Sequence, residues 1–234
     1  MYLSNRVTFI SQGYFLNQKA RDLYQLPDNV AIKYCPNPVE IDDEFDVKSY
    51  KKKNKIIFLG RIESVKRGWL FCEIAKRMPQ YEFYMLGQSF REKDENTAIM
   101  SKYKDIPNLH FTGHVDGIEK ENHIKDAKVL VNTSIHEALP ISFLEALSFG
   151  TLLVSNRNPE DLTSKFGIYV GTVLGDGFDK IDLYVDAINR LMNDEKFVEK
   201  AQSAIDYVKE IHNVPRFVRE LKDVLYKESL KAKV

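Results

Sequence analysis

From Ile56 onward, short apolar runs alternate with longer amphipathic stretches along the chain. The runs are rich in β-branched and aromatic residues, which favour strands, and the stretches between them carry apolar positions at helical spacing. Regular alternation of this kind predicts an α/β fold in which helices wrap a parallel sheet. The expected strands, about six in number, are Ile56–Gly60, Tyr81–Leu86, Asn108–Thr112, Lys128–Thr133, Thr151–Ser155 and Gly167–Val170.

Helices are expected between these strands and beyond the last one. One apolar stripe follows the first strand and another follows the fourth. After Val170 the pattern turns helical, and Pro215 suits the first position of a last helix. The stripes consist of Trp69, Cys72, Ile74, Ala75 and Met78, and of Phe143, Leu144 and Leu147, and the later helices are expected over 183–192, over 197–211 and from 215 onward.

The first 55 residues do not follow this alternation of apolar runs and amphipathic stretches. They predict strands at Val7–Ser11 and Val30–Tyr34, with a short helix, Phe15–Tyr24, between them. An acidic run over 42–46 then precedes a lysine-rich run over 48–55. The lysines fit either a phosphate or nucleic-acid patch or a solvated linker in which neighbouring opposite charges neutralise one another, and we favour the linker. We therefore expect three segments, 1–55, 56–214 and a C-terminal helix at 215–234.

Composition narrows the class of protein. The chain has 234 residues, 44% of them hydrophobic, so it can bury a substantial core and is not expected to be disordered. Its 34 basic and 34 acidic residues cancel, which removes the long-range field of a general nucleic-acid or anionic-membrane binder. No apolar run reaches the roughly 18 residues of a membrane span. We expect a cytoplasmic protein, with peripheral membrane association left open.

The two cysteines, Cys35 and Cys72, have no metal-ligand spacing and are expected to be buried thiols in a reducing compartment. Neither His110 with His114 nor His136 with Glu137 completes a zinc motif. No metal site is therefore expected.

The segment GRIESVKRG follows the first of the six strands. Gly60 and Arg61 fall at the carboxyl end of this strand, where ligands bind in an open α/β sheet, and Lys66 and Arg67 fall where the next helix begins. The three cations suit a diphosphate, and Gly60 lets the backbone approach it. The alternative is that Arg61 and Lys66 are solvated, one of them paired with Glu63. Neither GxxxxGK[ST] nor GxGxxG occurs, so a P-loop nucleotide triphosphatase and a dinucleotide-binding fingerprint lack support.

The segment SIHEALPISFLEALSFG follows the fourth strand. Pro140 fits the first turn of a helix, which leaves the N–H groups of Ile141, Ser142 and Phe143 free to face a ligand. With the helix dipole, these groups can bind a phosphate or a sugar hydroxyl. Glu137 lies before this helix and can accept hydroxyl groups of a hexose; the alternative is a first-turn acid that stabilises the dipole.

Glu145 is anomalous because it interrupts the otherwise apolar stretch FLEAL. A carboxylate at such a position must be hydrogen-bonded or partly exposed, since burying it unpaired costs several kcal/mol. A ribose cis-diol would satisfy it, because the two carboxylate oxygens can accept both hydroxyls. The alternative is an ordinary exposed helix position.

The spacing E-x7-E in EALPISFLEALSFG, together with GR-x4-K upstream, resembles the donor-binding domain of retaining family-4 glycosyltransferases (group 1), which have the GT-B fold of two Rossmann-like domains. The resemblance runs from about Ile56 to the C-terminus and includes LGQ at 86–88 and FTGHV at 111–115. It implies that 56–214 is a Rossmann-like domain with helices on both faces, the C-terminal half of a GT-B fold. It also implies that 1–55 is a stub of the acceptor domain with the interdomain linker.

The resemblance further implies roles for individual residues. Arg61 and Lys66 would bind the donor diphosphate and Glu137 the transferred sugar, and these would be the catalytic residues. Glu145 would bind the nucleotide ribose. The remaining donor contacts would come from Gly60, from Pro140, Ile141 and Ser142 beside the sugar and phosphate, and from Gly113, His114 and Val115 beside the base.

Members of this family transfer a sugar with retention from a nucleotide diphosphate sugar, UDP- or GDP-linked, to an acceptor hydroxyl, without a metal or another cofactor. The expected partners are that donor and a glycan or lipid-linked acceptor, with a separate acceptor domain or a homo-oligomer supplying what 1–55 lacks. The alternatives are a noncatalytic module that binds nucleotide sugars or a partner, and a sugar-nucleotide epimerase. The sequence leaves the sugar, the base and the acceptor open.

Overall fold

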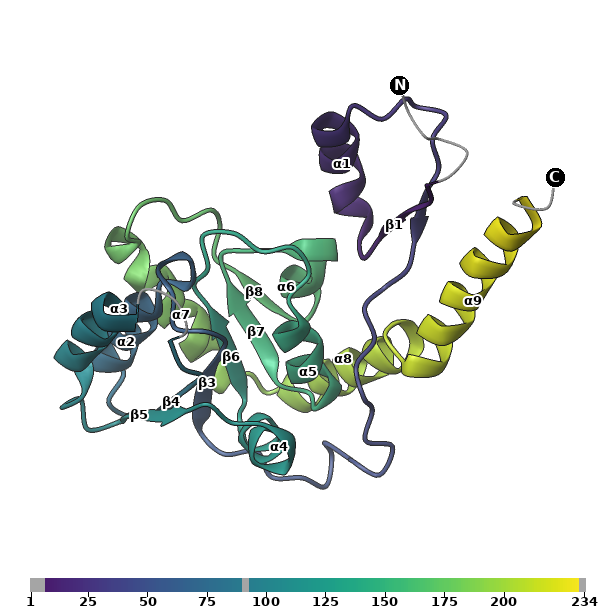
Figure 1. Ribbon diagram of the computed structural model, residues 1–234. Coiled ribbons are helices and arrows are strands. Elements are labelled where there is room, and N and C mark those ends of the chain that lie inside the picture. Colours follow the sequence, from purple (N-terminus) through teal and green to yellow (C-terminus); the bar gives the residue numbers. More distant parts are fainter. Residues whose placement is uncertain (1–6, 90–92, 232–234) are drawn as a thin grey trace.

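The computed structural model describes residues 7–89 and 93–231 (Figure 1). Its main body is a six-stranded sheet, and all of the strand pairs in it are parallel. Each expected strand is confirmed to within one residue at either end. The strands are β3 (Lys55–Leu59), β4 (Glu82–Leu86), β5 (Leu109–Gly113), β6 (Val129–Asn132), β7 (Leu152–Ser155) and β8 (Gly167–Tyr169).

Helices cover both faces of this sheet, as expected (Figure 1). Helices α2, α3 and α7 lie on one face, and α4, α5 and α8 lie on the other. The helices are α2 (Gly68–Arg77), α3 (Lys93–Met100), α4 (Gly117–Asp126), α5 (Ile141–Ser148), α6 (Leu162–Lys165), α7 (Ile181–Met192) and α8 (Phe197–Ile211). Because both faces are covered, the central strands are buried throughout and consist of apolar runs such as Ile56–Phe58 and Leu152–Val154.

The strand order is β5-β4-β3-β6-β7-β8. The chain moves outward from β3 to β5 and then returns past β3 to β6. The connections that leave the carboxyl ends of β3 and β6 therefore lead to helices on opposite faces of the sheet. In sheets of this order, ligands bind where such connections diverge, and we call this place the crevice between β3 and β6.

Residues 7–34 form a small separate unit, at the top of Figure 1. Residues 35–54, which we call the linker, connect this unit to β3. Strands β1 (Phe9–Ser11) and β2 (Ile32–Tyr34) pair in parallel, and α1 (Asn17–Tyr24) connects them after a short 3₁₀ turn, Tyr14–Leu16. The expected strand, helix and strand are thus confirmed, with narrower bounds. The unit contacts the main body through the Phe15 amide, which donates to Glu160 Oε1 at 3.1 Å.

The long helix α9 (Val214–Lys231) follows α8 and begins one residue before Pro215, so proline occupies the second helical position and not the first. Similarly, α7 begins at Ile181, earlier than expected. The expected boundaries after residues 55 and 214 stay a prediction, and residues 1–6 and 232–234 of the outer segments lie outside the described residues. Within the described residues, no helix has the length and apolar character needed to cross a membrane. Cys35 and Cys72 are buried free thiols, as expected.

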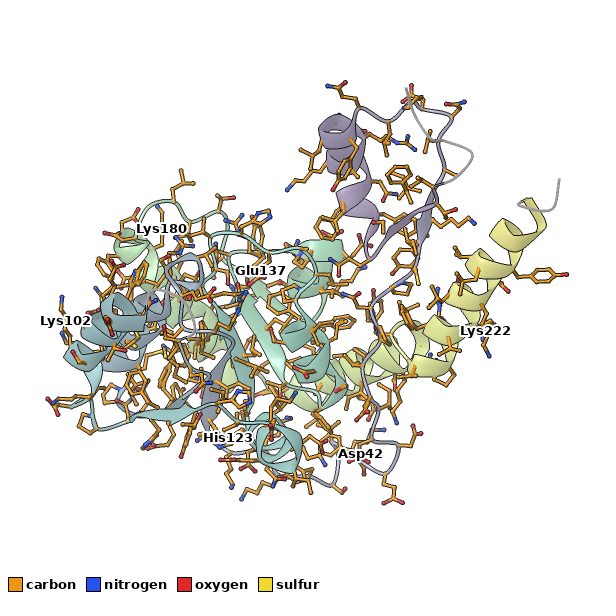
Figure 2. The ribbon with its side chains drawn as sticks, viewed as in Figure 1. Asp42, Lys102, His123, Glu137, Lys180 and Lys222 are labelled. Carbon is orange, nitrogen blue, oxygen red and sulfur yellow. The ribbon has the colours of Figure 1, made fainter. Side chains whose placement is uncertain are left out.

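The lysine-rich run before β3 is solvated only in part, so the linker interpretation holds for some of its lysines and is wrong for others. Lys52 and Lys55 are buried, whereas Lys51 and Lys53 are exposed. The Nζ of Lys52 donates to the carbonyls of Lys125 and Ala127, where α4 ends, and to Thr151 Oγ1. An ammonium group at this place satisfies carbonyls that a helix end leaves without partners. Figure 2 shows Asp42 of the linker on the same side of the molecule as α4, where it accepts from Lys125 Nζ at 2.9 Å.

Burial lowers the pKa of Lys52 to about 7 in the folded protein, below its ordinary value of 10.5. Above about pH 7 the unfolded chain then binds more protons at this lysine than the folded chain does, so the free energy of unfolding should rise with pH until the unfolded lysine also deprotonates. Relative to Lys52→Met, we expect the native protein to gain on the order of 1 to 2 kcal/mol between pH 7 and pH 9 in urea unfolding. The exposed-site variant Lys51→Met serves as the control and should parallel the native curve. A constant difference between native protein and Lys52→Met across this range would contradict the prediction.

Gly87 lets the ends of β3 and β4 meet backbone to backbone. A Cβ atom on Gly87 would lie 1.9 Å from the carbonyl oxygen of Gly60, and its φ is +146°. The same ends are joined by the Gly60 amide, which donates to Leu86 O at 3.0 Å. The Gly87 amide donates to Gly113 O at 2.8 Å and extends the contact to β5. Only glycine fits this close approach.

Gly87→Ala should therefore lower the free energy of unfolding by about 3 kcal/mol or more, because the backbone must separate to admit the methyl group. Gly171→Ala is the control, since Gly171 has φ +82° with no atom near the added Cβ, and it should lose only the roughly 1 to 2 kcal/mol of left-handed backbone strain. Chemical unfolding of both variants measures the difference. Equal losses would show that the contact with Gly60 does not matter.

Candidate functional site

Two side chains meet across the crevice between β3 and β6. Lys66 comes from the connection after β3 and Glu137 from the connection after β6, and Lys66 Nζ lies 2.5 Å from Glu137 Oε1. Both side chains are largely enclosed, with exposed fractions of 20% and 10%. Glu137, labelled in Figure 2, lies within the main body of the molecule. The crevice therefore contains a preformed ion pair.

Asn132, the last residue of β6, also donates to Glu137 Oε1, at 3.2 Å. The sequence interpretation did not include this asparagine, although a buried amide at the end of an apolar strand is a usable signal. Glu137 precedes α5, which begins at Ile141, so the alternative role as a first-turn acid is wrong. Two donors instead fix the Glu137 carboxylate in the crevice.

Arg67 is not the third ligand-facing cation that the sequence suggested. Its side chain is fully buried and donates to backbone carbonyls, from Nε to Thr133 O at 2.7 Å and from Nη1 to Val173 O and Gly175 O. Thr133 Oγ1 in turn donates to the carbonyl of Lys66 at 2.7 Å. Arg67 thus holds the turn that carries Lys66 against the end of β6.

The glycine and arginine after β3 border a small cavity. Gly60, Arg61, His114 and Val115 line a cavity of about 210 Å³ at the ends of β3, β4 and β5. The Arg61 side chain is 54% exposed, and its Nη1 lies 3.4 Å from Glu63 Oε1, the pairing weighed as an alternative. Gly113 borders an adjoining cavity of about 710 Å³. The structure thus brings four of the predicted residues to one cavity.

The amino end of α5 differs from the expectation in the place of Pro140 and in the number of free amides. Pro140 lies just before the helix with ψ +128° and is not in its first turn. The Phe143 amide donates to Pro140 O at 3.1 Å, so it is not free. The amides of Ile141 and Ser142 donate no hydrogen bond within the described part of the chain. Two backbone donors, and not three, remain available at this helix end.

Glu145 is hydrogen-bonded and partly exposed, as its position in an apolar helix requires. Its Oε1 accepts from Lys120 Nζ at 2.7 Å, and the side chains of Glu145 and Lys120 are 24% and 29% exposed. Both residues line a cavity of about 480 Å³ between α4, α5 and the linker. The sequence interpretation missed Lys120. Its spacing from the buried Ile124 places it on the side of α4 that faces α5, which is the signal that could have found it.

The arrangement combines carboxylate acceptors with cationic and backbone donors along one edge of the sheet. Carboxylates can accept hydroxyl groups, while Lys66, Arg61 and the amides at the start of α5 can bind anionic oxygens. Among the described residues, no three His, Cys, Asp or Glu side chains converge as a metal site would need. His110 instead hydrogen-bonds Glu82, and His114 lies 3.6 Å from Asp116.

The fold resembles solved glycosyltransferases. The pneumococcal O-GlcNAc transferase GtfA, in complex with UDP and GlcNAc, superposes with a TM-score of 0.73 at 15% identity, over 94% of this chain and 45% of that chain. Anabaena Alr3699/HepE, in complex with UDP and glucose, gives a TM-score of 0.71 at 15% identity, over 96% of this chain and 64% of that chain. These superpositions confirm the expected fold class, an α/β fold with a six-stranded parallel sheet flanked by helices.

Sequence comparison agrees with the fold. The O-antigen biosynthesis glycosyltransferase WbnH of Escherichia coli is 30% identical over 92 residues, which are 39% of this chain and 25% of that protein. The chain thus matches only a part of this relative's length. The family model of the glycosyl transferases group 1 matches residues 39–211. The chain belongs to the glycosyl transferases group 1 family.

Proposed function

We propose that this chain is the donor-binding part of a retaining glycosyltransferase that takes a sugar from a nucleoside diphosphate sugar. The observation that carries the proposal is the Lys66–Glu137 pair, 2.5 Å apart in the crevice between β3 and β6. This pair puts a phosphate-binding cation and a hydroxyl-binding carboxylate side by side. A sugar joined to a diphosphate needs both groups at adjacent positions.

The donor would span the carboxyl edge of the sheet. Its diphosphate would contact Arg61, Lys66 and the two unpaired amides at the start of α5, and Glu137 would accept sugar hydroxyls. Its ribose would donate to Glu145, and its base would lie beside Gly113, His114 and Val115, with Gly60 allowing close approach of the backbone. In support of this path, Gly60, Arg61, His114 and Val115 line one cavity, and Ile141 and Glu145 line another.

Catalysis in this scheme is electrostatic. As the bond between the anomeric carbon and the diphosphate oxygen breaks, negative charge develops on the leaving diphosphate. Arg61, Lys66 and the positive end of the α5 dipole would stabilise that charge without a metal ion. The acceptor oxygen would bond to the anomeric carbon on the same face, and its hydroxyl proton would pass to an oxygen of the leaving diphosphate. The GtfA structure is a complex with UDP and GlcNAc and the HepE structure a complex with UDP and glucose, which favours UDP-hexoses as first donors to test.

The acceptor half is expected to lie outside the described sheet. The β1–α1–β2 unit has only two strands, fewer than an independent sheet normally needs. It borders an apolar cavity that includes Phe9, Leu23, Phe217 and Leu221. We infer that this unit completes an acceptor-binding domain with further polypeptide, either in the same protein or in a partner, and that the acceptor is a glycan or a lipid-linked glycan.

A noncatalytic module that binds nucleotide sugars is the second candidate. The observation that favours it is that every residue assigned above to the donor lies in the main body of the described structure. Sugar transfer to a glycan acceptor, measured by mass spectrometry with the product of an adjacent gene added, separates the two functions. Donor binding without transfer in that mixture favours the module.

Calorimetric titration with UDP-glucose, UDP-GlcNAc and GDP-mannose tests the donor site. We expect one of them to bind, and we expect Arg61→Ala and Glu145→Ala each to weaken the binding about tenfold or more, because each removes hydrogen bonds to a phosphate or ribose group. Arg77→Ala is the matched control, since Arg77 pairs with Asp182 away from the crevice. Unchanged affinity in both site variants would overturn the site, and no binding to any of the three donors would count against the function itself.

A further inference from the structure

We propose that Lys120 is a positioning residue for the nucleotide ribose, acting through Glu145. The inference rests on the proposed function, because it takes Glu145 as the ribose acceptor. It adds a residue on α4 that neither E-x7-E nor GR-x4-K includes. Its ligand chemistry is a ribonucleoside diphosphate with a vicinal diol.

The geometry joins two helices at one carboxylate. Lys120 Nζ donates to Glu145 Oε1 at 2.7 Å, from α4 to α5. No group within the described residues hydrogen-bonds Glu145 Oε2. The lysine therefore occupies one oxygen and leaves the other open to a ligand.

The cavity that holds this pair reaches the amino end of α5. Lys120, Glu145 and Ile141 all line the same space of about 480 Å³, and Gly117 at the start of α4 lines it too. Ile141 carries one of the two amides assigned to the phosphates, and Gly117 closely follows the loop assigned to the base. A ribose lies between the phosphates and the base in any nucleotide, so the cavity position agrees with the role of Glu145.

Orientation of the carboxylate is what Lys120 contributes. A free glutamate side chain loses rotamer entropy when a ligand fixes it. The neighbours of Glu145 on α5, Leu144 and Ala146, are buried and offer it no polar partner. The bond to Lys120 fixes the carboxylate before the ligand arrives, and a carboxylate oxygen that already accepts one hydrogen bond can accept a second.

The other lysine of α4, Lys125, has partners of its own. Lys125, further along α4, pairs with Asp42 at 2.9 Å and lies 3.7 Å from Glu121. It therefore anchors the linker to α4 and does not contact Glu145. This separation makes Lys125 a matched control, since its substitution removes an ion pair of the same helix without touching the Glu145 carboxylate.

The test compares two ligands in each variant. The nucleoside diphosphate selected by the donor titrations, UDP or GDP, and its 2′-deoxy form are titrated into native protein, Lys120→Met, Lys120→Arg, Lys125→Met and Glu145→Gln. We expect the native protein to prefer the ribose form, and Lys120→Met to lose about fivefold or more of that preference, which corresponds to one oriented hydrogen bond. Lys120→Arg should restore part of it, and Lys125→Met should keep it. Lys120→Met added to Glu145→Gln should cause no further loss.

The outcomes separate the two proposals. If the native protein binds neither diphosphate, the proposed function fails. If it binds but does not distinguish ribose from 2′-deoxyribose, Glu145 is not the ribose acceptor and the inference is overturned with it. If the native preference exists and Lys120→Met keeps it, or binds the ribose form more tightly, Lys120 does not position Glu145 and this inference alone is overturned. Circular dichroism and urea unfolding confirm that each variant is folded.

Discussion

The crevice depends on the hydrogen bonds that the buried guanidinium group of Arg67 donates to backbone carbonyls. Its Nε and Nη1 donate to the carbonyls of Thr133, Val173 and Gly175, so one side chain joins the turn after β3, the end of β6 and the loop at 171–177. Burying a cation is costly, and these three carbonyl dipoles offset a part of that cost, although Arg67 Nη2 has no hydrogen-bond partner among the described residues. Because Arg67 directly follows Lys66, fixing the one fixes the other. The position of the Lys66 backbone relative to the end of β6 therefore depends on a fully buried side chain.

The sequence predicted the sheet well because its strands are buried on both faces. Residues 56–58 and 152–154 must be apolar at every position. When such short apolar runs alternate with amphipathic stretches, few structures other than buried parallel strands are compatible with them. The site was predictable where a residue contradicted its surroundings. Glu145 interrupts an apolar helix, and this conflict alone indicated that it needs a polar partner. Neither inference required knowledge of the packing between distant segments.

Packing between distant segments decided what the sequence could not predict. Lys66 and Arg67 are adjacent cations, yet one faces the crevice and the other is buried, because the partners of Arg67 come from β6 and the 171–177 loop. Lys52 differs from exposed Lys51 for the same reason, since its carbonyl partners lie at the end of α4. A weak local signal existed for Arg67, because a cation at the start of α2 opposes the helix dipole and therefore needs other partners.

Both glutamates of the E-x7-E spacing are paired with a lysine from another connection, Glu137 with Lys66 and Glu145 with Lys120. A chain with no net charge can therefore hold a site for an anionic ligand, because the charges are balanced pair by pair. The pairs do not have to break for a diphosphate to bind, since an ammonium group has three donors and Lys66 uses one of them on Glu137. A phosphate oxygen that accepts from a second N–H of Lys66 would then be linked to the Glu137 carboxylate through the Lys66 ammonium group. That linkage would hold the sugar, bonded to the phosphate, against the group that accepts its hydroxyls.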